Sequence, residues 1–239
     1  MLTAVSRNFV NRVRPLEAFM SVRRLIANPD ATEEVFRVIE ALKGDSITRA
    51  VARLRNAPGG RNLLASRAQI LPLLCDRERL RALPEGTVGR AYLELMERQG
   101  ISAQGLVAAS ASDHRHTALT ADEQWLADRL RDIHDLQHVL TGYGPDPLGE
   151  LCLLSFMTTQ TYNRGIAFIV FMARRNARKR FPGIDLDACV EEGAALGRAC
   201  RWLPALRLED LLGEPLQEVR AQLGMPEPQR YWQARASFA

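Results

Sequence analysis

The chain has 239 residues, of which 46% are hydrophobic and 25% are charged, a composition typical of a globular protein and not of a disordered chain. The 32 basic and 28 acidic residues leave a formal net charge of only +4. Because acidic and basic residues are interspersed, we predict no nucleic-acid partner. The most apolar stretch, residues 151–173, is interrupted by Gln160, Asn163 and Arg164, so no segment is expected to span a membrane.

Apolar residues recur at intervals of three and four along nearly the whole chain, and no alternating β-branched run is bounded by turn residues. This pattern predicts an all-α protein. In the first half, the expected helices cover residues 10–28, Asp30 or Thr32 to Gly44, Asp45 or Ser46 up to Pro58, 63–74 and 87–99. We interpret Pro58-Gly59-Gly60-Arg61 as a turn; the alternative, a small anion-binding nest, lacks the Gly-x-x-x-x-Gly-Lys pattern of a P-loop.

Residues 100–120 are the least periodic part of the chain and are expected to form a connection, with His114 and His116 on the surface. Thr120 and Glu123 match a capping box, which predicts that a long helix begins there and continues through Leu140. Further helices are expected over 148–180, 187–200 and 208–223. No long polar linker divides them, so residues 1–239 are predicted to form a single compact domain.

The four cysteines lack the spacing of a zinc ribbon or of a Cys-x-x-Cys redox motif. We therefore expect reduced, buried thiols in an intracellular protein. These cysteines are Cys75, Cys152, Cys189 and Cys200.

The most informative pattern is His134-Asp135-x-x-His138. Histidines four positions apart project from one face of a helix, as the two zinc-binding histidines of zincins do. Glu150 follows His138 after a turn rich in glycine and proline, so its carboxylate is a candidate third ligand. Asp135 could ligate the metal, orient a water or bond an imidazole, and the alternative to a site is a pair of polar histidines at the edge of the core.

A second region combines apolar residues 151–173 with arginines that follow at its end. One interpretation is a core helix whose C-terminus carries cations, which the helix dipole favours. The other is an apolar groove or membrane-facing surface rimmed by arginines. The candidate groove residues are Phe156, Ile166, Ile169 and Val170.

The motif His134-Asp135-x-x-His138 followed by eleven residues and Glu150 resembles the signature of the coenzyme Q biosynthesis protein 4 family. The surrounding segments 129–142 and 149–150 resemble its central block. Weaker matches at Pro29-Asp30-Ala31-Thr32, Pro58-x-Gly60-Arg61, Leu83-Pro84-x-x-Thr87-x-Gly89-x-x-Tyr92 and Arg220-x-x-Leu223-Gly224 extend the resemblance over most of the chain.

The resemblance implies an all-helical peripheral membrane protein, often a homodimer, that binds a divalent metal and an isoprenoid tail. Its implied role is either a metal-dependent decarboxylase that removes the C1 carboxylate of a polyprenylated 4-hydroxybenzoate, with oxidation there, or a non-catalytic scaffold for the other ubiquinone-biosynthesis proteins. A third possibility is an isoprenoid carrier with a structural metal. Arginine-rich composition suggests a bacterial member, at the cytoplasmic face of the inner membrane; a eukaryotic one would lie on the matrix side of the mitochondrial inner membrane.

On the enzyme hypothesis, His134, His138 and Glu150 hold the metal and Asp135 is a further ligand or the catalytic base. Arg129 or Arg131 would supply positive charge near the headgroup. Zinc is the preferred metal, and iron, manganese and magnesium remain open because histidine and carboxylate ligands suit several of them.

Overall fold

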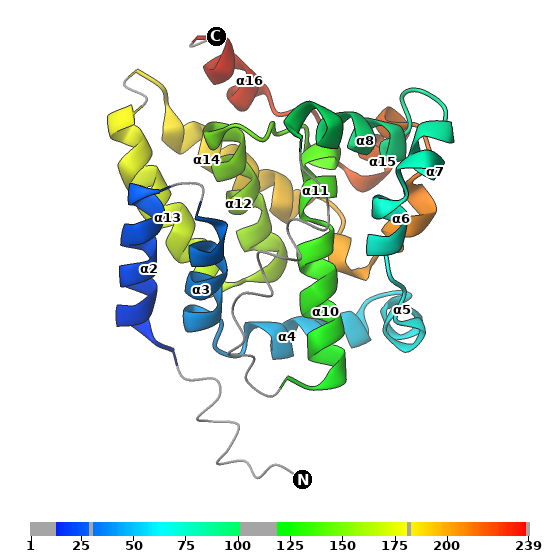
Figure 1. Ribbon diagram of the computed structural model, residues 1–239, viewed down its shortest axis with the longest axis horizontal. Coiled ribbons are helices and arrows are strands. Elements are labelled where there is room, and N and C mark those ends of the chain that lie inside the picture. Colours follow the sequence, from blue (N-terminus) through cyan, green and yellow to red (C-terminus); the bar gives the residue numbers. More distant parts are fainter. Residues whose placement is uncertain (1–12, 29–30, 101–118, 181–182, 238–239) are drawn as a thin grey trace.

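The computed structural model describes residues 13–28, 31–100, 119–180 and 183–237. Within them the chain folds into α-helices and two short 3-10 turns, with one isolated β-bridge between Thr87 and Pro215 and no strand (Figure 1). The α-helices are α2 (Pro15–Ala27), α3 (Thr32–Leu42), α4 (Ser46–Asn56), α5 (Gly60–Ser66), α6 (Leu71–Cys75), α7 (Arg77–Ala82), α8 (Val88–Gln99), α10 (Ala121–Asp132), α11 (His134–Thr141), α12 (Pro147–Thr161), α13 (Arg164–Arg180), α14 (Leu186–Ala199), α15 (Leu216–Leu223) and α16 (Gln229–Ala236). The 3-10 turns are η1 (Leu203–Ala205) and η2 (Leu208–Leu211). The all-α prediction is confirmed.

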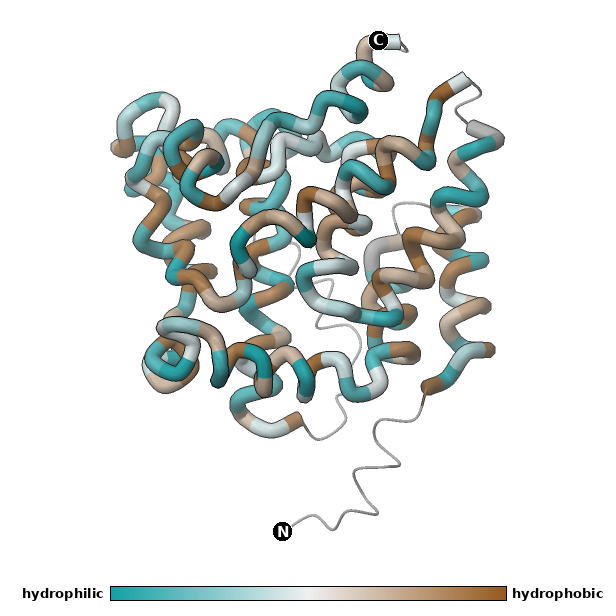
Figure 2. Tube along the Cα trace, turned by 180° about the vertical axis from the view of Figure 1, so that it is seen from behind, coloured by the Kyte–Doolittle hydropathy of each residue, from teal (hydrophilic) through white to brown (hydrophobic). Residues whose placement is uncertain are grey.

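Helix α12 lies at the centre and is buried over most of its length. It packs most extensively on α14, where two glycines allow close approach: a Cβ at Gly197 would lie 2.1 Å from Thr159 Oγ1, and one at Gly193 would lie 2.4 Å from the Cys152 carbonyl oxygen. Around this pair, α3, α8, α11, α13 and α15 contribute to the main hydrophobic core. A smaller core cluster joins α4, α5 and α10. Figure 2 shows the resulting mixture of hydrophobic and hydrophilic residues along each helix.

The capping box at the start of α10 is confirmed. Thr120 Oγ1 accepts a hydrogen bond from the Glu123 amide at 3.3 Å, and Glu123 Oε2 accepts one from the Thr120 amide at 2.8 Å. The helix it begins is shorter than predicted, because it ends at Asp132 and a new helix, α11, begins at His134. Ile133 separates the two with φ −87° and ψ 0°.

The prediction of one helix over 148–180 is also wrong, because the segment forms two helices. Tyr162 separates them with a left-handed φ of 51°. Asn163 Oδ1 then accepts hydrogen bonds from the amides of Gly165 and Ile166, which starts α13 in a new direction. The expected helices at 63–74 and 208–223 are likewise divided into shorter ones, and α16 was not predicted.

Of the predicted groove residues, Phe156, Ile166 and Ile169 are buried in the main core, and Val170 packs partly buried against it. The structure thus favours the core interpretation, and no groove is seen there among the described residues. No described helix combines the length and apolar character needed to cross a membrane. No disulfide joins cysteines among the described residues; Cys152, Cys189 and Cys200 are buried as expected, whereas Cys75 is half-buried.

Candidate metal centre

The two histidines of the motif lie on the first turn and a half of α11. Their rings face each other edge to face, with centroids 5.2 Å apart. Gly142, with φ 82°, ends the helix and donates its amide to the His138 carbonyl at 2.9 Å. Glycine is favoured at this position because a left-handed φ strains other residues. The chain can therefore reverse direction directly after the histidine pair.

A tight loop brings Glu150 back over the histidines. Asp146 caps α12 by accepting hydrogen bonds from the amides of Leu148 and Gly149, each at 3.1 Å. Tyr231, from the distant helix α16, donates its hydroxyl to Asp146 Oδ2. A Cβ at Gly149 would lie 2.0 Å from the carbonyl oxygen of the loop residue Gly144, so only glycine fits there. Glu150 consequently lies in the first turn of α12 with its side chain toward α11.

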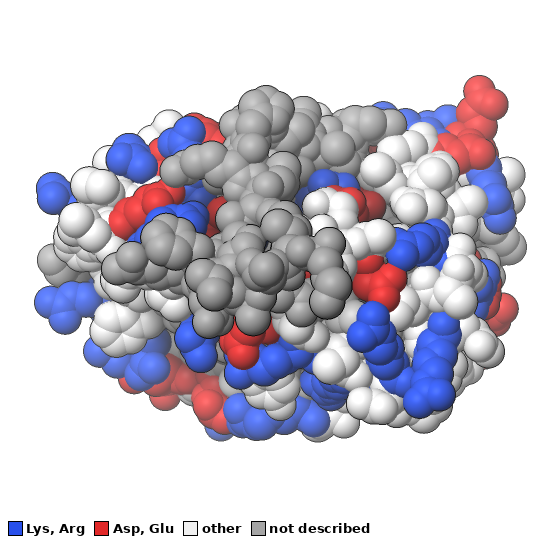
Figure 3. Space-filling model, turned by 90° about the horizontal axis from the view of Figure 1, so that it is seen from below, with Lys and Arg blue, Asp and Glu red and all other residues white. Residues whose placement is uncertain are grey.

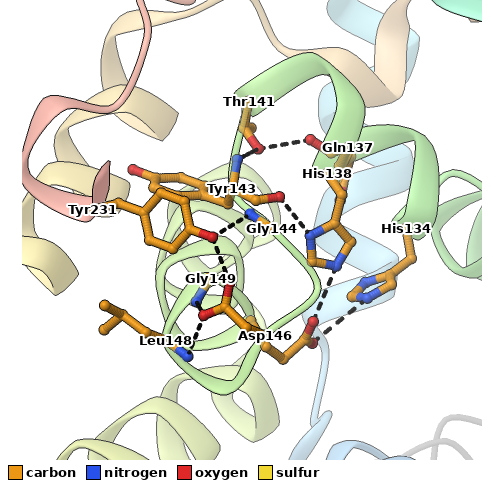
Figure 4. Close-up of polar contacts among 11 residues, drawn as sticks. His134, Gln137, His138, Thr141, Tyr143, Gly144, Asp146, Leu148, Gly149 and Tyr231 are labelled. Carbon is orange, nitrogen blue, oxygen red and sulfur yellow. Dashed lines mark hydrogen bonds and ion pairs between the residues drawn. The ribbon is translucent and has the colours of Figure 1, made fainter. Parts of the chain in front are cut away.

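The three predicted ligands meet in one place (Figure 4). His138 Nε2 lies 3.0 Å from Glu150 Oε2, and His134 Nε2 lies 3.5 Å from Glu150 Oε1. One ligand atom from each residue lies within 4.8 Å of the other two. Tetrahedral zinc, with bonds of about 2.1 Å to nitrogen and oxygen, fits between atoms spaced in this way. His138 is 5% exposed and Glu150 is 38% exposed, so one side of the cluster is accessible.

The loop also fixes which nitrogen of His138 faces the cluster. His138 Nδ1 lies 3.0 Å from the Tyr143 carbonyl oxygen. A carbonyl oxygen can only accept, so Nδ1 carries the hydrogen and donates it. In the neutral ring, Nε2 then holds a lone pair that points at the Glu150 carboxylate. Two acceptor atoms 3.0 Å apart require a proton or a metal cation between them. The hydrogen bond from Nδ1 to a backbone carbonyl is typical of histidines that bind a metal through Nε2.

The charges of the cluster stabilise one another in the metal-free state. Burial alone would lower the pKa of His134, but the negative charge of Glu150, a hydrogen bond to it and the charge of Asp135 together raise that pKa to about 9. Burial would raise the pKa of Glu150, yet the positive charge of His134 and hydrogen bonds from both histidines hold it well below its usual range. A metal cation can replace the proton in this arrangement.

Asp135 is not brought into the three-residue cluster. It follows His134 on α11, half-buried, and its carboxylate has no hydrogen bond to any described residue. Tyr92 on α8 lies close enough for the charge of Asp135, after burial itself, to raise the pKa of its hydroxyl. The role of Asp135 as ligand or base stays a prediction.

The two candidate arginines bind protein groups instead of lying free at the cluster. Arg129 is buried and donates to Glu209 at 2.6 and 2.9 Å and to the Leu206 carbonyl at 2.8 Å, which joins α10 to η2. Arg131 forms ion pairs with Asp128 and Asp132. Their predicted role near a headgroup therefore has no support in these contacts. His114 and His116 lie outside the described residues.

Sequence reasoning missed the supporting residues Tyr143, Asp146 and Tyr231. Asp146 could have been suspected from its place before Pro147, since aspartate followed by proline is a common start of a helix. Nothing in the sequence indicates that the Tyr143 carbonyl bonds a histidine.

The fold and the cluster together define an all-α protein with a partly open His/His/Glu centre. The model of the family described as Coenzyme Q (ubiquinone) biosynthesis protein Coq4 matches residues 9–229. Similar proteins include two named ubiquinone biosynthesis protein coq4, mitochondrial: that of Aspergillus fumigatus is 30% identical over 188 residues, and that of Penicillium rubens is 30% identical over 185. Each alignment covers 74% of this chain and 61% or 62% of the relative.

The fold is shared with a crystal structure from Nostoc punctiforme, of a protein provisionally assigned to ubiquinone biosynthesis. The TM-score is 0.68 and the identity is 22%, and the match covers 90% of this chain and all of the other. The chain therefore belongs to the Coq4 family of ubiquinone biosynthesis proteins, and it spans about three fifths of the length of the relatives named above.

Proposed function

We propose that this protein is a metal-dependent enzyme of ubiquinone assembly that removes the C1 carboxylate of a polyprenylated 4-hydroxybenzoate-type ring as carbon dioxide and leaves a proton in its place. Oxidation at that carbon needs an external oxidant, such as molecular oxygen, to accept the electrons. The observation that carries the proposal is the position of His138, whose Nδ1 lies 3.0 Å from the Tyr143 carbonyl oxygen and whose Nε2 lies 3.0 Å from the Glu150 carboxylate. His134 completes a set of three ligands with a partly exposed side. Such a set leaves a coordination position for substrate, as catalytic zinc sites do.

The chain's own residues would divide the work as follows. His134, His138 and Glu150 would hold the metal, preferably zinc, with iron, manganese or magnesium as alternatives. A divalent metal bound there supplies a Lewis acid for the ring oxygen or carboxylate. Asp135, beside His134 and with a carboxylate that has no hydrogen-bond partner among the described residues, would hold or deliver a proton.

We propose further that the protein works at a membrane surface, where a polyprenylated substrate resides. In a bacterium it would reach this substrate from the cytoplasmic leaflet, and in mitochondria from the matrix side. Support comes from apolar side chains that α2 and the neighbouring helix α13 leave in solvent. Leu16 is 71% exposed and Phe171 is 62% exposed, and Phe19 and Met20 lie on the same face of α2 as Leu16. A homodimer and contacts with other ubiquinone-biosynthesis proteins remain part of the same proposal.

The test is a mass-spectrometric profile of quinones and their precursors in cells that lack the gene. Wild type, His138→Ala and Glu150→Gln are each supplied in trans, with Glu94→Gln, a surface carboxylate on α8, as the matched control. We expect a ring-carboxylated polyprenyl precursor to accumulate, and only wild type and the control to clear it. Equal rescue by the folded ligand variants would refute the catalytic metal and leave a scaffold or an isoprenoid carrier. An unchanged profile on deletion would refute the assignment to this pathway.

A further inference from the structure

A basic hollow lies at the end of the molecule where α4, α5 and the start of α10 meet, away from the histidine cluster. Its volume is about 660 Å³. Figure 3 looks at the molecule from this end and shows basic side chains close together on its right-hand side. The polar residues that line the hollow are Arg55, Asn56, Arg61, Arg67 and Asp122.

One carboxylate holds two of the three guanidinium groups in place. Asp122 Oδ2 accepts from Arg55 at 2.6 Å, and Asp122 Oδ1 accepts from Arg67 at 2.7 Å. Arg67 also donates to the Ala121 carbonyl at 2.7 Å. The third guanidinium is oriented by the backbone, because Arg61 Nε donates to the Arg55 carbonyl at 2.9 Å.

These contacts leave donors unused. Both terminal nitrogens of Arg61, and Nε and one terminal nitrogen of Arg55, have no partner among the described residues. Three positive charges and one negative charge line the hollow, which gives it a net charge of +2. Guanidinium groups donate through a planar fork that matches the oxygen atoms of phosphate. The hollow is therefore matched to a doubly charged oxyanion.

The turn that the sequence marks as Pro58-Gly59-Gly60-Arg61 shapes this site. Gly59 adopts a φ of 72°, and a Cβ at Gly60 would lie 1.9 Å from the Leu54 carbonyl oxygen, so the turn folds tightly against α4. A second hollow of about 340 Å³ runs over this turn and shares Arg55, Asn56 and Arg61 with the first. Arg61 thus stands between two adjoining hollows, each large enough for a phosphate group.

We propose that the hollow formed by Arg55, Arg61 and Arg67 is a binding site for the phosphate group of a phosphorylated ligand. Asp122 lies at the start of α10 and His134 follows the end of that helix, so nearly the whole length of α10, about 18 Å at a rise of 1.5 Å per residue, separates the two sites. The ligand's phosphate can come from a soluble phosphate ester or diphosphate, or from a phospholipid headgroup. The site does not depend on a metal at the histidine cluster.

The experiment measures binding of inorganic phosphate and pyrophosphate to the full chain by isothermal titration calorimetry at low salt, where screening is weak. Cosedimentation with vesicles of phosphatidylcholine, with and without phosphatidylglycerol, distinguishes a lipid source. The variants are Arg61→Gln and Arg55→Gln. The matched control is Arg98→Gln, because Arg98 is also exposed and also donates Nε to a backbone carbonyl, that of Glu94, at 3.3 Å. Circular dichroism and the melting temperature establish that each variant folds.

We expect each site variant to weaken binding about tenfold or more, since each removes charged hydrogen bonds to the anion, and the control to bind like wild type. Loss of pyrophosphate binding in the site variants supports a soluble ligand. Loss confined to vesicles that contain phosphatidylglycerol supports a headgroup. The proposal is overturned if wild type binds no probe, or if the site variants and Arg98→Gln bind alike.

Discussion

Replacing Glu150 by glutamine should change how the stability of the metal-free protein depends on pH. In wild type, the carboxylate of Glu150 helps to raise the pKa of His134 to about 9, although burial opposes this. The unfolded chain has the ordinary histidine pKa of about 6.5. In the Glu150→Gln variant the charge of Glu150 is gone while burial persists, and only the charge of Asp135 still opposes burial, so the folded-state pKa of His134 falls from about 9 back toward its ordinary value.

The size of the effect follows from the difference between the two pKa values of His134, about 2.5 units at roughly 1.36 kcal/mol each, or about 3 kcal/mol. A raised folded-state pKa stabilises the protein fully below the unfolded pKa, and this stabilisation is lost as the pH rises through the folded pKa. The free-energy difference between wild type and Glu150→Gln should therefore fall by about 3 kcal/mol between pH 6 and pH 10.

The assay is urea unfolding in the presence of EDTA at several pH values across this range. Glu94→Gln, which removes an exposed carboxylate outside the cluster, is the control and should differ from wild type by a constant amount. If the curves for wild type and Glu150→Gln run parallel from pH 6 to pH 10, the charge coupling between Glu150 and His134 is refuted.

The remaining predictions concern the metal and the packing. Zinc binding at pH 7.5 should release at least one proton, because His134 must lose its proton to ligate; calorimetry in two buffers of different ionisation enthalpy measures this, and no release contradicts it. Arg129→Ala should cost about 3–5 kcal/mol in urea unfolding, because it leaves the buried Glu209 carboxylate unpaired, and a loss below about 1 kcal/mol would contradict that pairing. Gly197→Ala should cost about 1–3 kcal/mol or more because α14 would be forced off α12, whereas Gly213→Ala, whose Cβ would meet nothing closer than 4.0 Å, should melt like wild type.

How far the fold could be predicted depends on whether each signal is local. The three-and-four spacing and the capping box at Thr120 lie within a few residues and gave the helical class and the start of α10. The break at Tyr162 depends on distant contacts: Trp202 donates its indole nitrogen to the Gln160 carbonyl at 2.7 Å, across 42 positions of sequence. At Ile133 no proline or glycine marks the end of α10, so sequence patterns cannot place it.

In the candidate site, too, local features were predictable and those that depend on distant residues were not. His134 and His138 share a helix face by their spacing, so the pair was predictable. The orientation of the Tyr143 carbonyl depends on the whole loop and could not be derived from residue types. The pairing of Arg129 with Glu209 could not be predicted, because Glu209 lies 80 positions away in the sequence.

The central claim is that His134, His138 and Glu150 bind one divalent metal without Asp135. Equilibrium dialysis against zinc, with metal counted by mass spectrometry, tests it most directly on wild type, His138→Ala, Glu150→Gln and Asp135→Asn. We predict one zinc ion per chain for wild type and for Asp135→Asn, and affinities at least about tenfold weaker for the two ligand variants. Ligand variants that bind zinc like wild type, or an Asp135→Asn variant that loses zinc as they do, would contradict the account.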